Sequence, residues 1–446
     1  MSRAAAPLKI AIIGSGIAGI SAAWLLSRRH DVTVFEKDAR LGGHVNTVPV
    51  PDLPQTCFVD TGFIVYNEPA YPNLTALFKH LSVPTQPADM SLAVSLPRSD
   101  LEYSGTSLLG LFARGRNVVS PRFWSMLRDL VRFYREASRD AGSLDASITL
   151  GDYLRRNHYG PAFIDDHLLP MASAIWSAPV SSILDYPARS FINFNVNHGL
   201  LKLTGRPIWR TVTGGSRNYL DALTASFRSS LYPGRAAVAV IGSDDGARVV
   251  DADGETSSFD HVVLATHADQ ALALLRNPDA SARKLPGAFR YSDNRAVLHS
   301  DPTLMPRRRR VWASWNFIGS ADMQSPPTVT YWMNRLQSLP QRRQFFLTLN
   351  PSTAPRATVY ETEYSHPLFD SAALAAQQSL WGIQGQNGLW YCGSYFGSGF
   401  HEDALQSGLA VAEAIDPLCR RPWSVPDESG RIVMRSPNAA DNRIAA

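Results

Sequence analysis

Three glycines near the amino terminus have the spacing of a phosphate-binding turn. They form the pattern G-x-G-x-x-G. The first glycine allows a tight turn, the second lets the backbone approach a pyrophosphate, and the third lets a helix pack closely against a strand. With the residues between them, the predicted contacts are Gly14, Ser15, Gly16, Ile17, Ala18 and Gly19. The motif predicts a binding site for the diphosphate of a dinucleotide.

The segments around this turn have the pattern that would position it. Residues 9–13 predict a buried strand, the apolar periodicity of residues 17–25 predicts a helix, and residues 31–35 predict a second strand. The positive end of the helix dipole then faces the phosphates. Glu36 ends the second strand, where an acid accepts hydrogen bonds from the adenosine ribose. A glycine motif inside a complete βαβ unit is a specific signal for a Rossmann-type nucleotide-binding domain.

A pair of glycines after the first motif indicates which dinucleotide the chain binds. Residues 40–47 read RLGGHVNT and follow Glu36 directly. This run resembles the extended FAD motif of the superfamily of flavin-containing amine oxidases, protoporphyrinogen oxidases and phytoene desaturases. In that superfamily the paired glycines lie against the diphosphate and flavin, which implies non-covalent FAD here. An arginine usually follows them, and His44 replaces it in this chain.

Further motifs narrow the resemblance. They are LGGH at 41–44, DTGFIVYN at 60–67, GGSR at 214–217, LATHADQ at 264–270, WASWN at 312–316 and GFHED at 399–403. They resemble a bacterial family of predicted NAD/FAD-binding proteins, which is similar to the amino-terminal FAD region of plant cyclopropane fatty acid synthases. In bacteria this family tends to accompany lipid-methylating synthases. The resemblance implies a lipid acyl substrate and a lipid methyltransferase as a partner.

The resemblance also implies cofactor contacts from distant parts of the chain. Ala265 and Thr266 stand where small residues let the chain pass FAD, and Val238 stands where a backbone contacts adenine, although it is equally an ordinary strand residue. A last motif begins at Gly393, and the helix after it points its amino terminus at the flavin. Beyond the first turn, the predicted set is Glu36, Lys37, Arg40, Gly42, Gly43, His44, Thr61, Gly62, Val238, Ala265, Thr266, Gly393, Ser394, His401, Asp403 and Ala404.

His401 and Glu402 are the candidate catalytic residues. An imidazole beside the flavin removes a substrate proton or, as a cation, stabilises the reduced flavin. Glu402 and Asp403 equally suit the first turn of a helix, where acids are favoured by the dipole. The chain contains no H-E-x-x-H, G-x-S-x-G or Walker sequence. We therefore predict no metal site, serine nucleophile or kinase site.

Two apolar groups allow either core packing or a binding role. Five aromatic side chains either line a substrate pocket or pack in the core: Trp312, Trp315, Phe317, Tyr331 and Trp332. One face of a predicted helix carries Phe123, Met126, Leu127, Leu130, Val131 and Tyr134, and mostly off that face lie Arg122, Arg128, Arg132 and Arg135. Such a helix covers a core or rests on an anionic membrane. The four arginines at 307–310 form a solvated loop or contact an acidic membrane surface.

Length and composition indicate a folded protein of more than one domain. The chain has 446 residues, of which 45% are hydrophobic and 18% charged. We expect an α/β protein with an amine oxidase-like two-domain architecture. Its discontinuous Rossmann-type FAD domain is predicted from residues 1–60, 205–279 and 385–422. A mixed α+β substrate domain is predicted from 61–204 and 280–384, and a flexible tail from 423–446.

Charge and cysteine content set the expected surroundings of the protein. A net charge of +4 without a nucleic-acid-binding motif predicts no nucleic-acid partner. Cys57, Cys392 and Cys419 lie too far apart for a disulfide framework, which favours a reducing, cytoplasmic location. Neither a signal peptide nor a membrane-spanning stretch is expected. Peripheral contact with the inner membrane surface is the alternative.

Three functions compete at this point. The first is a desaturase or dehydrogenase that removes a hydride equivalent from a modified or unsaturated fatty acyl chain of a lipid. The second is a flavin-containing amine oxidase, although only five lysines are present to supply the lysine that amine oxidases commonly place near the flavin. The third is an FAD-binding partner of a lipid methyltransferase, without turnover of its own. Steady flavin reduction by a lipid would separate the enzyme hypotheses from the third.

Overall fold

A five-stranded parallel sheet carries the predicted nucleotide-binding unit in the computed structural model, which describes residues 6–52, 55–319, 328–425 and 432–434. Its strand order is β10 (Leu231–Pro233), β2 (Asp31–Glu36), β1 (Lys9–Ile13), β14 (His261–Leu264) and β20 (Leu389–Tyr391). Residues 10–13 of the central strand are at most 3% exposed, as expected for a strand covered on both faces. The βαβ unit is as predicted, with α1 (Ile17–Leu26) between β1 and β2.

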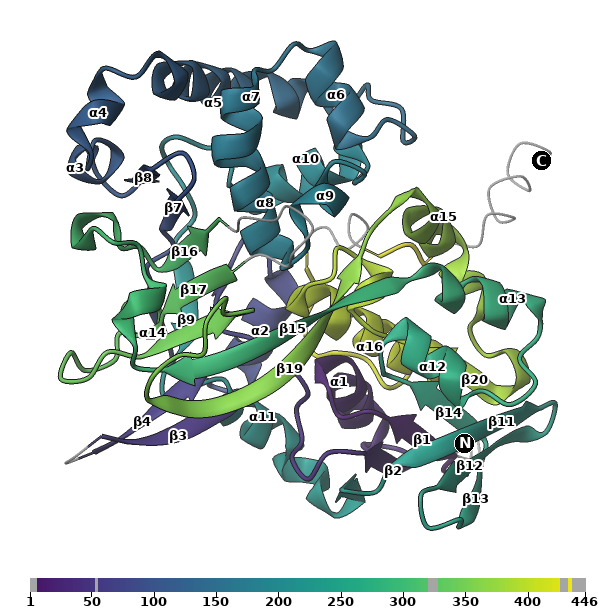
Figure 1. Ribbon diagram of the computed structural model, residues 1–446. Coiled ribbons are helices and arrows are strands. Elements are labelled where there is room, and N and C mark those ends of the chain that lie inside the picture. The colour runs from purple at the N-terminus through teal and green to yellow at the C-terminus, as the bar shows by residue number, and fades with distance from the viewer. Residues whose placement is uncertain (1–5, 53–54, 320–327, 426–431, 435–446) are drawn as a thin grey trace.

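A small sheet and several helices complete the part of the molecule that contains the parallel sheet. A small antiparallel sheet contains β11 (Ala237–Ser243), β12 (Gly246–Asp251) and β13 (Thr256–Phe259). The last long helix, α16 (His401–Ile415), packs so closely on α1 that a Cβ added at Gly408 would overlap the Ala18 carbonyl oxygen. Neighbouring helices are α11 (Arg217–Thr224), α12 (Ala268–Leu274), α13 (Ala280–Lys284) and α15 (Ser371–Leu380). The carboxyl-terminal segment thus returns to the amino-terminal unit (Figure 1).

A seven-stranded mixed sheet forms the second layer (Figure 1). Its order is β19 (Thr358–Leu368), β15 (Arg290–His299), β18 (Phe346–Leu349), β17 (Thr328–Trp332), β16 (Trp315–Ile318), β7 (Leu92–Leu96) and β8 (Leu101–Ser104). The parallel pairing of β16 with β7 joins two stretches that are more than 200 residues apart. Smaller strand groups are β3 (Thr47–Asp52) with β4 (Gln55–Asp60), and β5 (Tyr66–Asn67) with β9 (Trp209–Val212) and β6 (Thr85–Ala88).

Helices from the first intervening stretch gather at the top of Figure 1, away from the parallel sheet. They are α3 (Leu108–Leu111), α4 (Gly115–Val118), α5 (Pro121–Asp140), α6 (Leu150–Arg156), α7 (Pro161–Phe163), α8 (Leu169–Trp176), α9 (Val180–Ile183) and α10 (Ala188–Asn197). A π-helical turn at Ile164–Leu168 joins α7 to α8. The short α2 (Pro72–His80) packs instead on α16, and α14 (Met333–Leu336) follows β17.

This architecture confirms the predicted α/β two-domain fold. The parallel sheet takes strands from the beginning, middle and end of the chain, and the seven-stranded sheet takes them from the stretches between. The exact domain boundaries stay a prediction. The flexible tail from 423 also stays a prediction, although Trp423 stacks on Trp24 with ring centroids 5.8 Å apart and Ile432 is only 2% exposed. Within the described ranges, no helix combines the length and apolar character needed to cross a bilayer.

Most of the predicted pocket aromatics belong to the core. Trp312, Phe317 and Tyr331 are less than 10% exposed. Trp312 packs with Trp332 in one cluster, and Trp315 meets Tyr331 edge-on in another. Packing therefore accounts for these residues without a binding role.

Candidate active site

The first glycine turn is held by tight backbone packing. Gly14 has a φ of 103°, which favours glycine, and its N–H donates to the Phe35 carbonyl oxygen at 2.8 Å. A Cβ added at Gly19 would overlap the Gly14 carbonyl oxygen, so no side chain fits there without moving α1. The first and third glycines thus let the turn and the helix approach the sheet.

Gly16 differs from both, because space lies open in front of it. A Cβ added at this position would meet nothing within 4 Å. The amino terminus of α1 that follows has no side-chain cap and no acid in its first turn. An open cradle beside uncapped helix N–H groups fits a diphosphate group. The residues present therefore fit the pyrophosphate of FAD.

Glu36 and Ser15 connect the two glycine motifs. Ser15 donates to Glu36 Oε2 from its N–H at 2.9 Å and from its hydroxyl at 2.5 Å. The Ser15 hydroxyl in turn accepts the Gly42 N–H at 3.0 Å. Glu36 is 7% exposed, and its Oε1 accepts the Asp38 N–H at 2.9 Å. Ser15 is therefore a positioning residue, and Glu36 keeps acceptor capacity for ribose hydroxyls.

The chain segment after Gly42 is paired with the segment around Gly62. The Phe63 N–H donates to the His44 carbonyl oxygen at 2.7 Å, and a Cβ at Gly62 would overlap that oxygen. The Thr61 hydroxyl contacts Tyr364 Oη at 2.9 Å. Thr61 and Gly62 thus shape the site by holding residues 44–46 in place. The sequence predicted contacts at both positions but not this pairing.

The remaining predicted positions follow the ends of parallel strands. Ile13, Phe35, Leu264 and Tyr391 lie in register across the sheet. The segments after them therefore meet at one sheet edge, where α/β proteins bind ligands. The predicted contacts in or near these segments differ in burial. Lys37 and Val238 are exposed, Gly393 and Ala404 are buried, and the half-buried positions are Arg40, Gly43, Ala265, Thr266 and Ser394. The structure thus brings together most of the predicted FAD contacts.

Three histidines from distant segments form what we term the histidine cluster: His44, His267 and His366. The His44 ring centroid lies 5.6 Å from that of His366 and 6.1 Å from that of His267. Tyr364 lies next to them, 4.9 Å from His44. Sequence reasoning missed His366, which belongs to no motif. His267 had a signal, because it stands where the superfamily usually has glycine.

Burial keeps the histidine cluster neutral. Desolvation lowers the pKa of His366 to about 4, and it lowers the pKa values of His44 and His267 as well. An unfolded chain takes up these protons near pH 6.5, so it binds more protons than the folded chain below that pH. Stability is therefore expected to fall as the pH drops from about 6.5 toward about 4.

His401 begins α16 and is fixed by two aromatic neighbours. Its Nε2 lies 2.6 Å from Tyr219 Oη, and its ring stacks on Phe63 with centroids 3.9 Å apart. Burial lowers the pKa of His401 to about 3. Burial therefore favours the neutral imidazole over the cation that would stabilise reduced flavin. Its role as a neutral catalytic residue stays a prediction.

Glu402 has a structural function, and its catalytic role stays a prediction. Its carboxylate is 0% exposed. It accepts the Asn73 N–H at 2.8 Å, the Asn73 side-chain amide at 3.0 Å and the Leu74 N–H at 2.9 Å. These donors belong to the amino terminus of α2, so Glu402 caps a neighbouring helix. These contacts favour the capping role over a catalytic one.

Asp403 holds the loop that leads into α16. Its Oδ2 accepts the N–H groups of Ser398 at 3.1 Å and Phe400 at 2.9 Å. The capping role that the sequence left open thus applies to this acid too. Cys392, just before the last glycine motif, is fully buried, and burial raises the pKa of its thiol. A buried neutral thiol is a poor nucleophile for a covalent flavin link.

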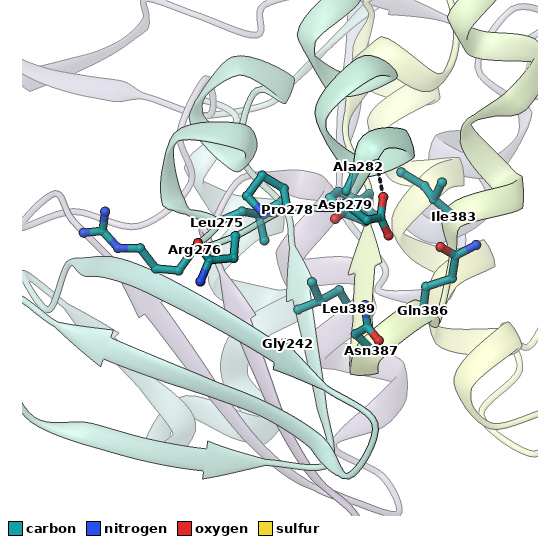
Figure 2. A pocket seen from close by; sticks show the side chains of 12 residues that line it. Gly242, Leu275, Arg276, Pro278, Asp279, Ala282, Ile383, Gln386, Asn387 and Leu389 are labelled. Atoms are coloured by element: carbon teal, nitrogen blue, oxygen red, sulfur yellow. Dashed lines mark hydrogen bonds between the residues drawn. The ribbon is translucent and has the colours of Figure 1, made fainter.

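The small cavity in Figure 2 is separate from these residues. It lies between Gly242, the segment around Pro278 and Leu389. Its volume is about 30 Å³, which corresponds to one water molecule. None of its lining residues belongs to the predicted FAD set. It is therefore no substrate site.

A Rossmann-type sheet with an open diphosphate cradle, joined to a second mixed sheet, defines an FAD-dependent oxidoreductase of two-domain type. The sequence profile of the flavin containing amine oxidoreductase family matches residues 17–298. The chain belongs to this family. FAD is its cofactor.

Comparison with solved structures shows the same fold. A redesigned putrescine oxidase is 14% identical, with a TM-score of 0.66 over 92% of this chain and 99% of that one. The CLA-producing fatty acid isomerase from P. acnes is 15% identical, with a TM-score of 0.63 over 92% and 98%. Reduced UDP-galactopyranose mutase is 13% identical, with a TM-score of 0.64 over 97% and 99%.

One curated relative matches over a shorter region. The carotenoid phi-ring synthase of Chlorobaculum tepidum is 28% identical over 185 residues. The match covers 38% of this chain and 28% of that protein. It therefore spans less than a third of the relative's length.

Replacing His401 by alanine should leave FAD bound but slow flavin reduction by about 10²-fold. The change removes the imidazole that contacts Tyr219 and Phe63 while leaving the buried carboxylates of α16 in place. Stopped-flow reduction of FAD-saturated protein measures it. Because the His401 pKa is about 3, His401 itself should add no inflection to the rate between about pH 5 and 8.

Tyr219→Phe is the matched control for this prediction. It removes only the hydroxyl that contacts His401 Nε2. If the two variants slow reduction together, the contact positions the imidazole. A His401→Ala protein that reduces its flavin at the wild-type rate removes His401 from the catalytic residues.

Proposed function

We propose that this flavoenzyme removes a hydride equivalent from an apolar substrate, and that the substrate is a modified or unsaturated fatty acyl chain of a lipid. The observation that carries the proposal is the neutral character of the side chains around the site. The histidine cluster is uncharged because burial lowers its pKa values. Neutral rings next to Tyr364 suit an uncharged, apolar group better than a cation.

The buried carboxylates of the site motifs are already engaged. Glu402 and Asp403 accept backbone N–H groups, as described above. Asp60 accepts the Thr47 hydroxyl at 2.5 Å and the Ser216 N–H at 2.9 Å. Burial raises the pKa of Asp60 to about 6. An ammonium substrate would therefore find no carboxylate among these that is available as its ion-pair partner.

The distribution of lysines gives independent support. All five lysines are described, and none lies on the seven-stranded sheet of the substrate domain. Lys37 follows β2, and Lys79, Lys202 and Lys284 lie at or beyond helix ends. This arrangement disfavours an amine oxidase that holds a lysine above the flavin. The names of two similar proteins, a fatty acid isomerase and a carotenoid synthase, are compatible with a lipid-like substrate.

Groups of the chain itself would bind the cofactor, orient the substrate and exclude water. When bound, FAD supplies the hydride acceptor of the reaction. The open cradle at Gly16 and the amino terminus of α1 hold the diphosphate, and Glu36 holds the ribose. The Tyr219 hydroxyl and the His401 imidazole form a hydrogen bond of 2.6 Å that would orient the imidazole. The buried rings keep water from the reacting carbon.

Anaerobic loss of flavin absorbance tests the proposal. The FAD-saturated protein is mixed with vesicles of unsaturated phospholipid, with vesicles of saturated phospholipid, or with putrescine. We expect unsaturated lipid to bleach the flavin and putrescine to leave it oxidised. Bleaching by putrescine alone would establish the amine oxidase function. If dithionite reduces the flavin but no substrate does, the protein is instead an FAD-binding partner, for which a lipid methyltransferase is the expected companion.

A further inference from the structure

Five large apolar side chains project from one corner of the molecule. They belong to α3, to the end of α4 with the residue after it, and to the start of α5, at the upper left of Figure 1. Their exposed fractions are 75% for Leu108, 77% for Leu109, 49% for Val118, 76% for Val119 and 50% for Trp124. We call these five residues the apolar corner. Single exposed apolar residues are common, but five within 17 positions form a patch.

The groove on the outer face of α5 extends this apolar surface. It has a volume of about 490 Å³ and is lined by Trp124, Leu127, Arg128, Val131, Arg132, Arg135 and Glu136. The sequence predicted one apolar face on α5, but in the structure the residues of that face lie on two sides of the helix. Phe123 and Met126 are buried in the core, whereas Leu127 and Val131 line the outer groove. The helix therefore covers a core with one side and presents apolar and basic groups on the other.

The segment that carries the apolar corner contains no acid itself, but three of its arginines pair with acids nearby: Arg114 with Asp100, Arg122 with Asp166, and Arg128 with Asp129. Residues 103–128 contain four arginines and no aspartate or glutamate. Arg116 and Arg135 are exposed, and neither has an acidic partner among the described residues. Arg116 and Arg135 therefore supply the positive charge that the ion pairs of this region leave uncompensated.

The arginine run at 307–310 lies beside the same corner. The 3₁₀ turn Arg309–Val311 packs against α3, and Val311 shares a small buried cluster with Ala113. Arg308 pairs with Glu102 at 2.7 Å, which leaves three arginines of the run outside that ion pair. Exposed Arg309 and Arg310 therefore add to the positive charge next to Leu108 and Leu109.

We propose that the apolar corner and the arginines around it bind the surface of an anionic phospholipid membrane. Exposed leucine, valine and tryptophan side chains enter the interfacial region, while arginines contact lipid phosphates. Charge complementarity identifies this occupant, because exposed arginines without an acidic partner in the described part of the chain (Arg116, Arg135, Arg309 and Arg310) surround apolar tips and match anionic headgroups over hydrocarbon. Binding of this kind is peripheral. It does not depend on the substrate proposed above, although it would bring the enzyme to acyl lipids.

Vesicle flotation of the FAD-bound protein tests this proposal without any turnover. The wild-type protein should float with vesicles of phosphatidylcholine and phosphatidylglycerol, and not with phosphatidylcholine alone. High salt should weaken the binding, since the Debye length shortens. The variant Arg116→Glu, Arg135→Glu, Arg310→Glu should bind at least about 100-fold more weakly, at about five-fold for each arginine lost. The variant Leu108→Ser, Leu109→Ser, Val119→Ser should also dissociate.

Matched variants elsewhere on the surface control for charge and hydrophobicity. Arg248→Glu, Arg276→Glu, Arg283→Glu changes three exposed arginines in other parts of the chain, and Leu418→Ser changes a side chain that is 70% exposed. Both controls should float like the wild type. The proposal is overturned if the wild-type protein fails to float, or if the controls lose as much binding as the corner variants. It is also overturned if the wild-type protein is a dimer that the leucine variant converts to a monomer, because the corner is then a subunit interface.

Discussion

The Gly16→Val protein is expected to fold like the wild type and to purify without FAD. The backbone of Gly16, with φ −62° and ψ 172°, suits any residue, and a Cβ there meets no protein atom within 4 Å. A valine side chain would instead occupy the cradle at the amino terminus of α1, where the diphosphate binds. We expect FAD affinity to fall at least about 10³-fold, because binding at helix N–H groups requires close backbone approach. Flavin absorbance and the thermal midpoint of the apoprotein measure the two effects.

Gly19→Val is the matched control, with the opposite expected outcome. A Cβ at Gly19 overlaps the Gly14 carbonyl oxygen, so the βαβ unit itself must distort. This variant should lose stability before any cofactor is added, by about 3 kcal/mol or more. If Gly16→Val binds FAD normally, the open space at Gly16 is not the diphosphate site. If it unfolds like Gly19→Val, its effect is structural.

Glu402→Ala should destabilise the folded protein by about 3–5 kcal/mol while leaving the chemistry of bound FAD unchanged. The change removes a buried acceptor from three N–H donors at the start of α2. Buried donors without an acceptor cost about 1–3 kcal/mol each. Chemical denaturation measures the free energy of unfolding, and stopped-flow reduction of the FAD-bound fraction measures the chemistry.

Glu255→Ala is the control for this change. Glu255 is a surface residue that pairs with Arg235 at 2.8 Å and has 73% of its side chain exposed. Its loss should change stability by less than about 1 kcal/mol. A Glu402→Ala protein of normal stability but slow flavin reduction would restore the catalytic role that the buried capping contacts argue against.

Local patterns in the sequence were sufficient for the nucleotide-binding unit. Residues 9–36 form strand, turn, helix and strand where predicted, because each of these elements depends on short-range periodicity and on glycine at fixed offsets. The split of the chain between two sheets followed from recognising the motifs that each segment carries.

Contacts between distant segments were decided by the tertiary structure alone. The sequence around Glu402 is equally consistent with capping of its own helix and with capping of α2. Only the packing of α16 on α2 distinguishes these two roles. His366 reaches His44 because β19 crosses the site, a placement that no local period encodes. Trp423 follows a polar, proline-rich pattern and still stacks on Trp24.

One physical reason explains why the sequence predicts some of these features and only the tertiary structure shows the others. Secondary structure and turns depend on interactions between residues close in the chain, which the sequence displays directly. The charge state of a histidine, the exposure of an apolar side chain and the partner of a buried carboxylate depend on burial, which is set by segments that meet only after folding. The sequence by itself determined that the chain binds FAD. The fold decided that burial lowers the pKa of His401, that Glu402 caps α2, and that the arginines at 307–310 lie beside α3, which carries Leu108 and Leu109.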